Sequence, residues 1–141
     1  MKKSAISKLI AILFCTGCIC GCQFGSSDQQ LVCNTMAGWK NAVTEKNLDA
    51  IMENYSEDFT SERGTGKEQT RDFMESIIYQ GYLDDVEIDI DNADINITDD
   101  TAEFYPVQIQ SQMVQSLSLK FTLKKEDKKT WRIFRSDTER R

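Results

Sequence analysis

Apolar positions in the first half of the chain repeat with the period of an α-helix. A helix is predicted over residues 29–45, after a candidate cap at Asp28, with apolar side chains at helical spacing (Leu31, Met36, Trp39, Val43). A second helix follows Asn47 and carries an apolar stripe (Leu48, Ile51, Met52, Tyr55). A third is predicted from the Ser/Thr-x-x-Glu capping box at Thr65 to Gly81, with Phe73 on its apolar side.

The repeat then changes to a period of two, which is typical of strands with one buried face. Alternation covers residues 86–90, 93–97, 102–109 and 117–123, and Trp131 and Ile133 share one face of a last strand. The phase slips near residues 91–92 and again at Tyr105 and Pro106, so a bulge or turn is predicted at each place. Polar stretches at 98–101, 110–115 and 124–129 are predicted to be turns or loops.

Helices followed by antiparallel strands predict an α+β domain. The chain has 141 residues, of which 40% are hydrophobic and 28% charged, and this size and composition favour one folded unit. We expect this domain to span residues 29–141.

The first 22 residues have the pattern of a targeting segment. Three lysines precede an uncharged, mostly apolar run at residues 9–19, which is too short for a bilayer-spanning helix of about 20 residues. The run ends in Ile19-Cys20-Gly21-Cys22, which resembles the bacterial lipobox. This resemblance implies a lipoprotein signal peptide at residues 1–21, lipidation of Cys22, and a short tether at residues 22–28. The alternative is an ordinary cleaved signal that happens to be rich in cysteine.

Lipidation would place the protein in the cell envelope, held to the membrane by acyl chains. Gln23 follows the acylated Cys22, and in Gram-negative lipoproteins this pattern implies the periplasmic face of the outer membrane. Cys33 is then the one thiol of the mature domain, so we expect no disulfide and a buried, unreactive Cys33.

Charge and composition exclude several classes of function. The chain has no His, which removes imidazole catalysis and His-ligated metals, and its net charge of -6 opposes nucleic-acid binding. Nine acidic residues lie between Asp84 and Glu103, where no Lys or Arg occurs. Their spacing at 89, 91 and 94 departs from a calcium loop at Ala93 and Asp94, so a solvated sheet face is the preferred interpretation. We predict no metal site and no cofactor.

Several residues in order resemble the nuclear transport factor 2-like superfamily over about residues 28–137. They are Trp39, Ala42, Asn47-Leu48, Tyr55 to Phe59, Gly64, Phe73, Ala102 and Trp131-Arg132-Ile133. The resemblance implies a cone-shaped roll, with three N-terminal helices in the concave face of a strongly bent antiparallel sheet. The same fold serves isomerases, dehydratases and catalytically silent binding modules, so it does not select a function.

The resemblance also allows a test for catalysis. In the ketosteroid-isomerase branch, an Asp a few residues after the Tyr of the second helix acts as general base, and alignment on Tyr55 places Arg63 there. A guanidinium cannot take up a proton near neutral pH. Asp58 or Glu62 could replace the base, but exposed loop carboxylates are the simpler interpretation.

Three functions remain open after these exclusions. The first is a non-catalytic envelope lipoprotein that binds a small apolar molecule or a protein partner, and the residues suggested for its pocket double as candidates for plain core packing (Trp39, Tyr55, Phe59, Arg63, Trp131). The second is an immunity or inhibitor-type lipoprotein that captures a basic partner through its acidic face. The third is a small isomerase or dehydratase-like enzyme. A polar outer sheet face predicts a monomer (Glu87, Asp89, Ser118, Lys120, Thr122).

Overall fold

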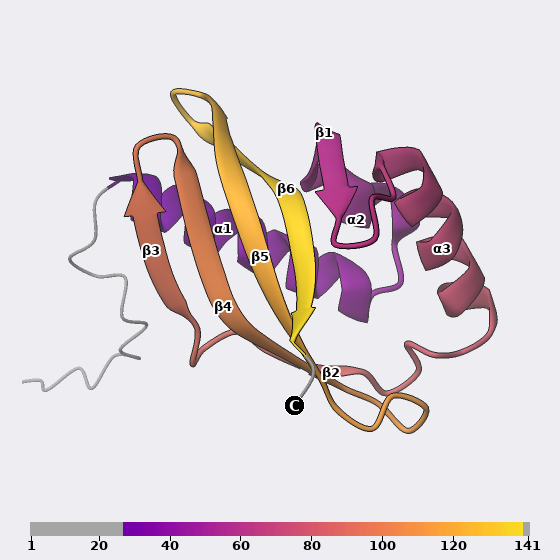
Figure 1. Cartoon of the computed structure of the whole chain (residues 1–141). Helices are drawn as coiled ribbons and strands as arrows, with labels where there is room; N and C mark the ends of the chain where they lie inside the picture. The colour runs from indigo at the N-terminus through magenta and orange to yellow at the C-terminus, as the bar shows by residue number, and fades with distance from the viewer. Residues whose placement is uncertain (1–26, 140–141) are drawn as a thin grey trace, which may run out of the picture.

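The computed structural model describes residues 27–139, so the predicted signal peptide and Cys22 lie outside the described residues. Within these residues the chain forms three helices and six strands, which Figure 1 labels. In chain order they are α1 (Ser27–Thr44), α2 (Leu48–Glu53), β1 (Tyr55–Ser61), α3 (Lys67–Tyr79), β2 (Glu87–Asp89), β3 (Asp94–Thr98), β4 (Thr101–Gln110), β5 (Leu117–Asp127) and β6 (Thr130–Glu139).

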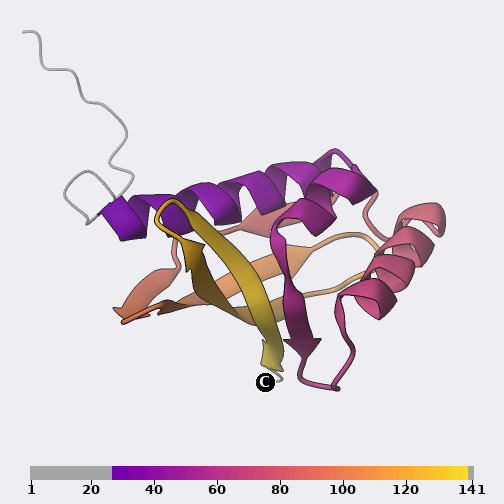
Figure 2. The ribbon, with the colours of Figure 1, turned by 90° about the horizontal axis from the view of Figure 1, so that it is seen from above.

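The strands form one curved sheet that packs its concave side on α1, which confirms the predicted α+β class (Figure 2). The strand order is β1-β6-β5-β4-β2, and β3 pairs with β4 beyond the end of β2. All pairs are antiparallel except β1 with β6, which is parallel. The β4–β5 register shifts between Phe104 and Val107, as the phase slip at Pro106 predicted. Such irregularities allow a sheet to bend.

The prediction of the second helix was wrong at its C-terminal end. The helix stops at Glu53, and Tyr55 begins β1. The backbone leaves the helix because the Ile133 amide donates to the Asn54 carbonyl at 2.8 Å, which aligns the chain with β6. Tyr55 is buried in either conformation, so the apolar stripe alone cannot distinguish them. The sheet is consequently mixed rather than wholly antiparallel.

Two other boundaries differ from the prediction. The α3 cap is Gly66, whose amide donates to the Gln69 side chain at 3.1 Å, while Thr65 bonds instead to the Ser61 hydroxyl at 2.6 Å. The predicted loop at 124–129 is largely strand, because β5 and β6 continue to pair up to Asp127 and Thr130. Both faces of this projecting hairpin are polar, so the hydrophobic period disappears there although the backbone stays paired.

The core lies between α1 and the concave face of the sheet. On α1 three of the four predicted residues are buried (Met36, Trp39, Val43), whereas Leu31 is half-buried and its neighbour Val32 is buried instead. They face buried positions of the long strands (Ala102, Phe104, Val107, Phe121, Leu123, Trp131, Ile133). Cys33 lies half-buried on α1, less enclosed than predicted. Phe73 lies on the solvent side of α3 with 60% exposure, so that part of the predicted stripe does not face the core.

Candidate functional site

The interior of the cone is filled by aromatic side chains. The Trp39 indole N–H donates to the Tyr55 hydroxyl at 3.1 Å, and the Trp39 ring packs edge-on against Phe121 with centroids 4.9 Å apart. Tyr55 makes a second edge-on contact with Phe59 at 4.8 Å. Burial raises the pKa of Tyr55 to about 12, so its phenol is neutral at physiological pH. These predicted pocket residues pack against one another, and each exposes at most 4% of its surface.

Trp131, a fourth residue predicted for the pocket, is buried on the same side of the sheet as Ile133. Its indole N–H donates to the Asp28 carboxylate at 3.2 Å, and Lys125 forms an ion pair with the same carboxylate at 2.9 Å. The hydrogen bond from Lys125 and then that from Trp131 lower the pKa of Asp28. These contacts join the start of α1 to the β5–β6 hairpin, so Trp131 connects the helix to the sheet.

Arg63 is the one predicted pocket residue at the surface. It lies in the turn between β1 and α3, where its backbone amide donates to the Ser61 hydroxyl at 3.2 Å. The five residues are therefore divided between the core and an exposed turn. The four aromatic side chains belong to the packed core of the domain.

The two carboxylates suggested as replacement bases also lie at the surface. Asp58 is ion-paired with Lys124 at 2.7 Å, and its side chain is 79% exposed. The hydrogen bond from Lys124 lowers the pKa of Asp58, which makes it a weaker base. Glu62 accepts the Thr138 backbone amide at 2.9 Å. A general base with a raised pKa needs burial, and both carboxylates lie in solvent-accessible positions.

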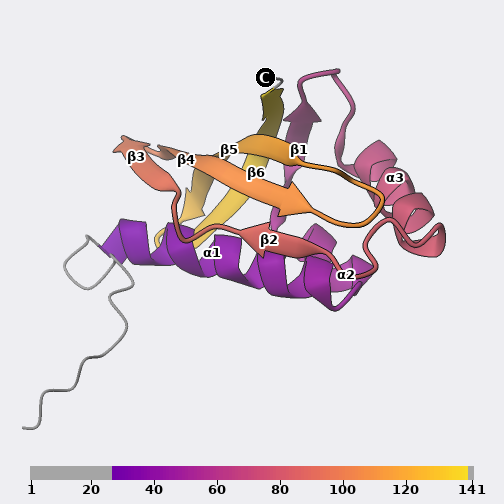
Figure 3. The same ribbon diagram turned by 90° about the horizontal axis from the view of Figure 1, so that it is seen from below.

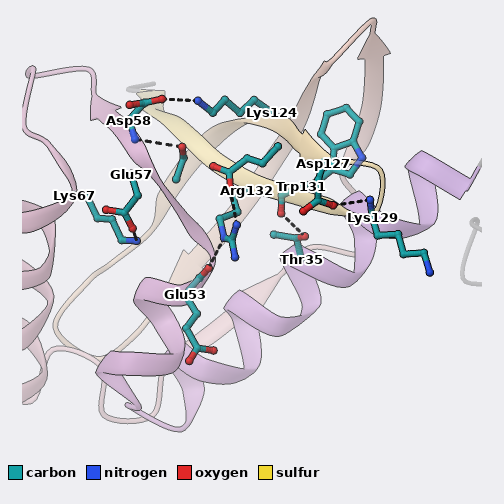
Figure 4. Close-up of polar contacts among 12 residues, drawn as sticks. Thr35, Glu53, Glu57, Asp58, Lys67, Lys124, Asp127, Lys129, Trp131 and Arg132 are labelled. Carbon is teal, nitrogen blue, oxygen red and sulfur yellow. Dashed lines mark hydrogen bonds and ion pairs between the residues drawn. The ribbon is translucent and has the colours of Figure 1, made fainter.

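A surface groove of about 380 Å³ lies where α1, the end of α2 and the β5–β6 hairpin meet. Its walls come from three segments (Leu31, Asn34, Thr35; Glu53, Asn54; Lys129, Thr130, Trp131, Arg132). Figure 4 shows the contacts that hold them: the Thr35 hydroxyl donates to the Trp131 carbonyl at 2.9 Å, and the Arg132 Nε donates to the Glu53 carbonyl at 3.1 Å. Only Trp131 was expected near a ligand, because no local motif unites segments so distant in sequence.

The acidic residues between positions 84 and 103 lie on β2, β3, β4 and in the loops and turns next to them. Asp84 pairs with Lys46, while the others make no ion pair within residues 27–139. The Asp89 carboxylate accepts hydrogen bonds from the Asp91 amide at 2.9 Å and from the Asn92 side chain at 2.8 Å, so it closes a turn where the calcium pattern was considered.

The part of the chain that the structure describes contains no group of three potential metal ligands. None of its helices is long and apolar enough to cross a membrane.

Comparison with known proteins identifies the fold. No family model matches the chain, and no curated protein matches its sequence. Among solved structures, a cystatin-like protein of unknown function from Nostoc punctiforme has a TM-score of 0.63 at 14% identity, covering 79% of this chain and 90% of its own. An NTF-2 like protein of unknown function from Shewanella oneidensis has a TM-score of 0.60 at 13% identity, covering 79% and 98% of the two chains.

A ketosteroid isomerase-like protein from Erwinia carotovora atroseptica is also similar, with a TM-score of 0.58 at 14% identity over 77% of this chain and 92% of its own. At these identities the likeness concerns the fold alone. The domain therefore has the cystatin-like, nuclear transport factor 2-like fold that the sequence resemblance implied.

Proposed function

We propose that this chain is a membrane-anchored envelope lipoprotein whose domain binds a small molecule or a protein partner at its surface and catalyses no reaction. The observation that carries the proposal is the filled cone interior, where Trp39, Tyr55 and Phe59 contact one another directly. A substrate would have to displace this packing, which interiors of native density do not permit without loss of stability.

An enzyme of the isomerase or dehydratase type is the alternative that the fold allows. Such chemistry needs a positioned base beside the substrate, and the nearby carboxylates of Asp58 and Glu62 are bound by surface partners instead. Arg63 is exposed and cannot serve as the base. These contacts support the binding function over the catalytic one.

The groove between α1 and the β5–β6 hairpin is the proposed place for a small ligand. Its volume of about 380 Å³ falls within the usual range for ligand pockets of roughly 300–1,000 Å³. The Lys129 ammonium at its rim makes no ion pair within the described residues, and Figure 4 shows this side chain extending away from the hairpin. The groove therefore has a cation available for an anionic group.

We further propose that the domain is a monomer, held to the membrane through Cys22. The outer face of the central strands pairs polar with polar residues (Ser118 with Glu139, Lys120 with Asp137, Thr122 with Arg135). An obligate interface is usually more apolar than this surface.

The anchoring is tested by expressing the full chain in a bacterial host and analysing the N-terminus by mass spectrometry. We expect an acylated Cys22 and partition of the protein into the detergent phase, with both lost in Cys22→Ala. Cys20→Ala is the matched control and should leave acylation intact. A mature protein that starts elsewhere and stays in the aqueous phase would contradict the proposal.

The absence of isomerase activity of the ketosteroid type is tested by double-bond migration in a 5-ene-3-ketosteroid. We expect no turnover above that of heat-denatured protein. Turnover that is abolished by Asp58→Asn or Glu62→Gln would replace the binding function with the enzyme.

A further inference from the structure

The strand β3 forms an open edge of the sheet. Within the described residues it pairs with β4 alone. In an antiparallel pair, alternate residues direct their backbone N–H and C=O groups away from the partner strand, so β3 presents a row of these groups at its outer side. Figure 1 shows β3 as the last strand on the left of the sheet. The neighbouring strand β2 lies beside α1 instead (Figure 3).

The inner face of β3 carries apolar side chains that the domain covers incompletely. Ile95 and Ile97 pack against the core but remain half-buried, whereas Ala102 and Phe104, their partners on β4, are fully buried. A further strand beside β3 would extend the sheet and cover the exposed parts of both isoleucines. The edge thus offers backbone hydrogen bonds and apolar contact together, the two requirements of strand addition.

The charge around this edge indicates what kind of strand it would accept. Exposed acidic residues surround it on β2, β3, β4 and the connecting turns (Glu87, Asp89, Asp91, Asp94, Asp99, Asp100, Glu103). None of them is ion-paired within residues 27–139, and no Lys or Arg occurs between Leu83 and Leu119. Two copies of this edge would bring like charges together, which costs binding energy, whereas a basic segment would be attracted.

We propose that the open edge of β3 binds an extended segment of a partner protein, rich in Lys or Arg, as an additional strand of the sheet. Backbone hydrogen bonds and cover for Ile95 and Ile97 supply the contact, and the surrounding carboxylates select the basic sequence. This inference rests on the proposed binding function and names the class of protein partner. It concerns a different surface from the groove beside α1.

The test uses the full lipoprotein, purified in detergent micelles, and fluorescent peptides of about ten residues, the length of a long strand. We expect a peptide of alternating Lys and Val to bind at near-physiological salt, and its Glu and Val counterpart not to bind. A Lys and Val peptide with alternate backbone amides methylated keeps the charge but loses hydrogen-bond donors. It should bind at least about tenfold more weakly, the effect of one or more lost hydrogen bonds.

Charge-reversal variants locate the binding site. Asp94→Lys combined with Asp100→Lys should weaken binding of the Lys and Val peptide by about tenfold or more, because Asp94 begins β3 and Asp100 lies in the turn that follows it. The matched control combines Asp72→Lys with Glu75→Lys on α3, which changes the net charge equally on the opposite side of the molecule (Figure 1). This control should retain affinity within about twofold. Thermal melts of both variants verify that each is folded.

Hydrogen exchange provides a readout that charge attraction alone would not change. Amides of β3 should exchange more slowly when the peptide is bound, because an added strand protects outward-facing N–H groups. Equal binding of the methylated peptide or equal weakening in both double variants would overturn the inference. So would a dimer in light scattering in which the β3 amides already exchange slowly without peptide. None of these results bears on ligand binding at the groove beside α1 or on acylation of Cys22, so failure here is distinguishable from failure of the proposed function.

Discussion

The two outer sides of the sheet differ in how the chain covers them. Next to β1, the segment leading to α3 turns back along the strand: Thr60 forms a bridge with Gly66, and the Ser61 amide donates to the Thr65 carbonyl at 2.9 Å. Beyond β3, no described residue pairs with the strand. One side of the sheet is therefore covered by the chain segment that follows its outer strand, and the other side is open.

The side chains are also more deeply buried on the β1 and β6 side of the sheet than on the β3 side. Trp131 and Tyr55 are almost fully buried on the β1 and β6 side, and each has a hydrogen-bond partner for its polar atom. On the β3 side, Ile95 and Ile97 are only half-buried. We therefore expect the stability of the domain to come mainly from the β1 and β6 side, which leaves β3 available for contact with a partner.

Truncating Trp131 should produce the largest loss of stability. Trp131→Ala removes a fully buried ring and its hydrogen bond to Asp28, so we expect the free energy of unfolding to fall by about 3–5 kcal/mol. Urea denaturation measures this change. A loss below about 1 kcal/mol would show that the β1 and β6 side does not dominate stability.

Removing the Tyr55 hydroxyl should have an intermediate effect. In Tyr55→Phe the buried Trp39 N–H loses its acceptor, which should cost about 1–3 kcal/mol at neutral pH. Tyr79→Phe is the matched control, because its ring is 91% exposed, and it should be neutral.

The same hydroxyl makes a prediction about pH. The pKa of Tyr55 is about 12 in the folded protein and near its ordinary 10.0 when unfolded, so the unfolded state loses the proton first. The contribution of the neutral Tyr55 phenol to the free energy of unfolding is complete below pH 10 and is lost as the pH rises through 12. Denaturation curves of the wild type should show that the free energy of unfolding falls over this pH range. In Tyr55→Phe, the part of this fall that Tyr55 causes should be absent. Parallel curves for the two proteins over this range would contradict the buried, neutral phenol.

The smallest effect is expected on the open side. Ile97→Ala removes a half-buried side chain and should cost about 1 kcal/mol, whereas Ile133→Ala, its fully buried counterpart on β6, should cost about 2–5 kcal/mol. Equal losses measured by urea denaturation would show that the two sides are equally packed.

Because Ile97 would contact an added strand, binding of the Lys and Val peptide should raise the stability of the wild type more than that of Ile97→Ala.

Prediction from the sequence succeeded where the local pattern of apolar residues agrees with the final fold. The period along α1 predicted three of its buried residues (Met36, Trp39, Val43), and the phase slip at Pro106 predicted the register shift in β4. Tyr55 was assigned to the wrong element because one apolar residue after a short helix fits a helix and a strand equally well. Four of the five residues suggested for a pocket are buried in the core, because aromatic residues that suit a ligand site also suit a core.

Composition and local period are sufficient for the α+β class, the order of the long elements, the absence of His and the acidic run. The parallel pairing of β1 with β6, the packing of the aromatic rings in the core and the meeting of three distant segments at the groove became known from the structure. The physical reason is that these features depend on contacts between residues far apart in the chain. The open edge of β3 combines the two: its acidic residues can be identified in the sequence, but only the arrangement of the sheet shows that no described strand pairs with its outer side.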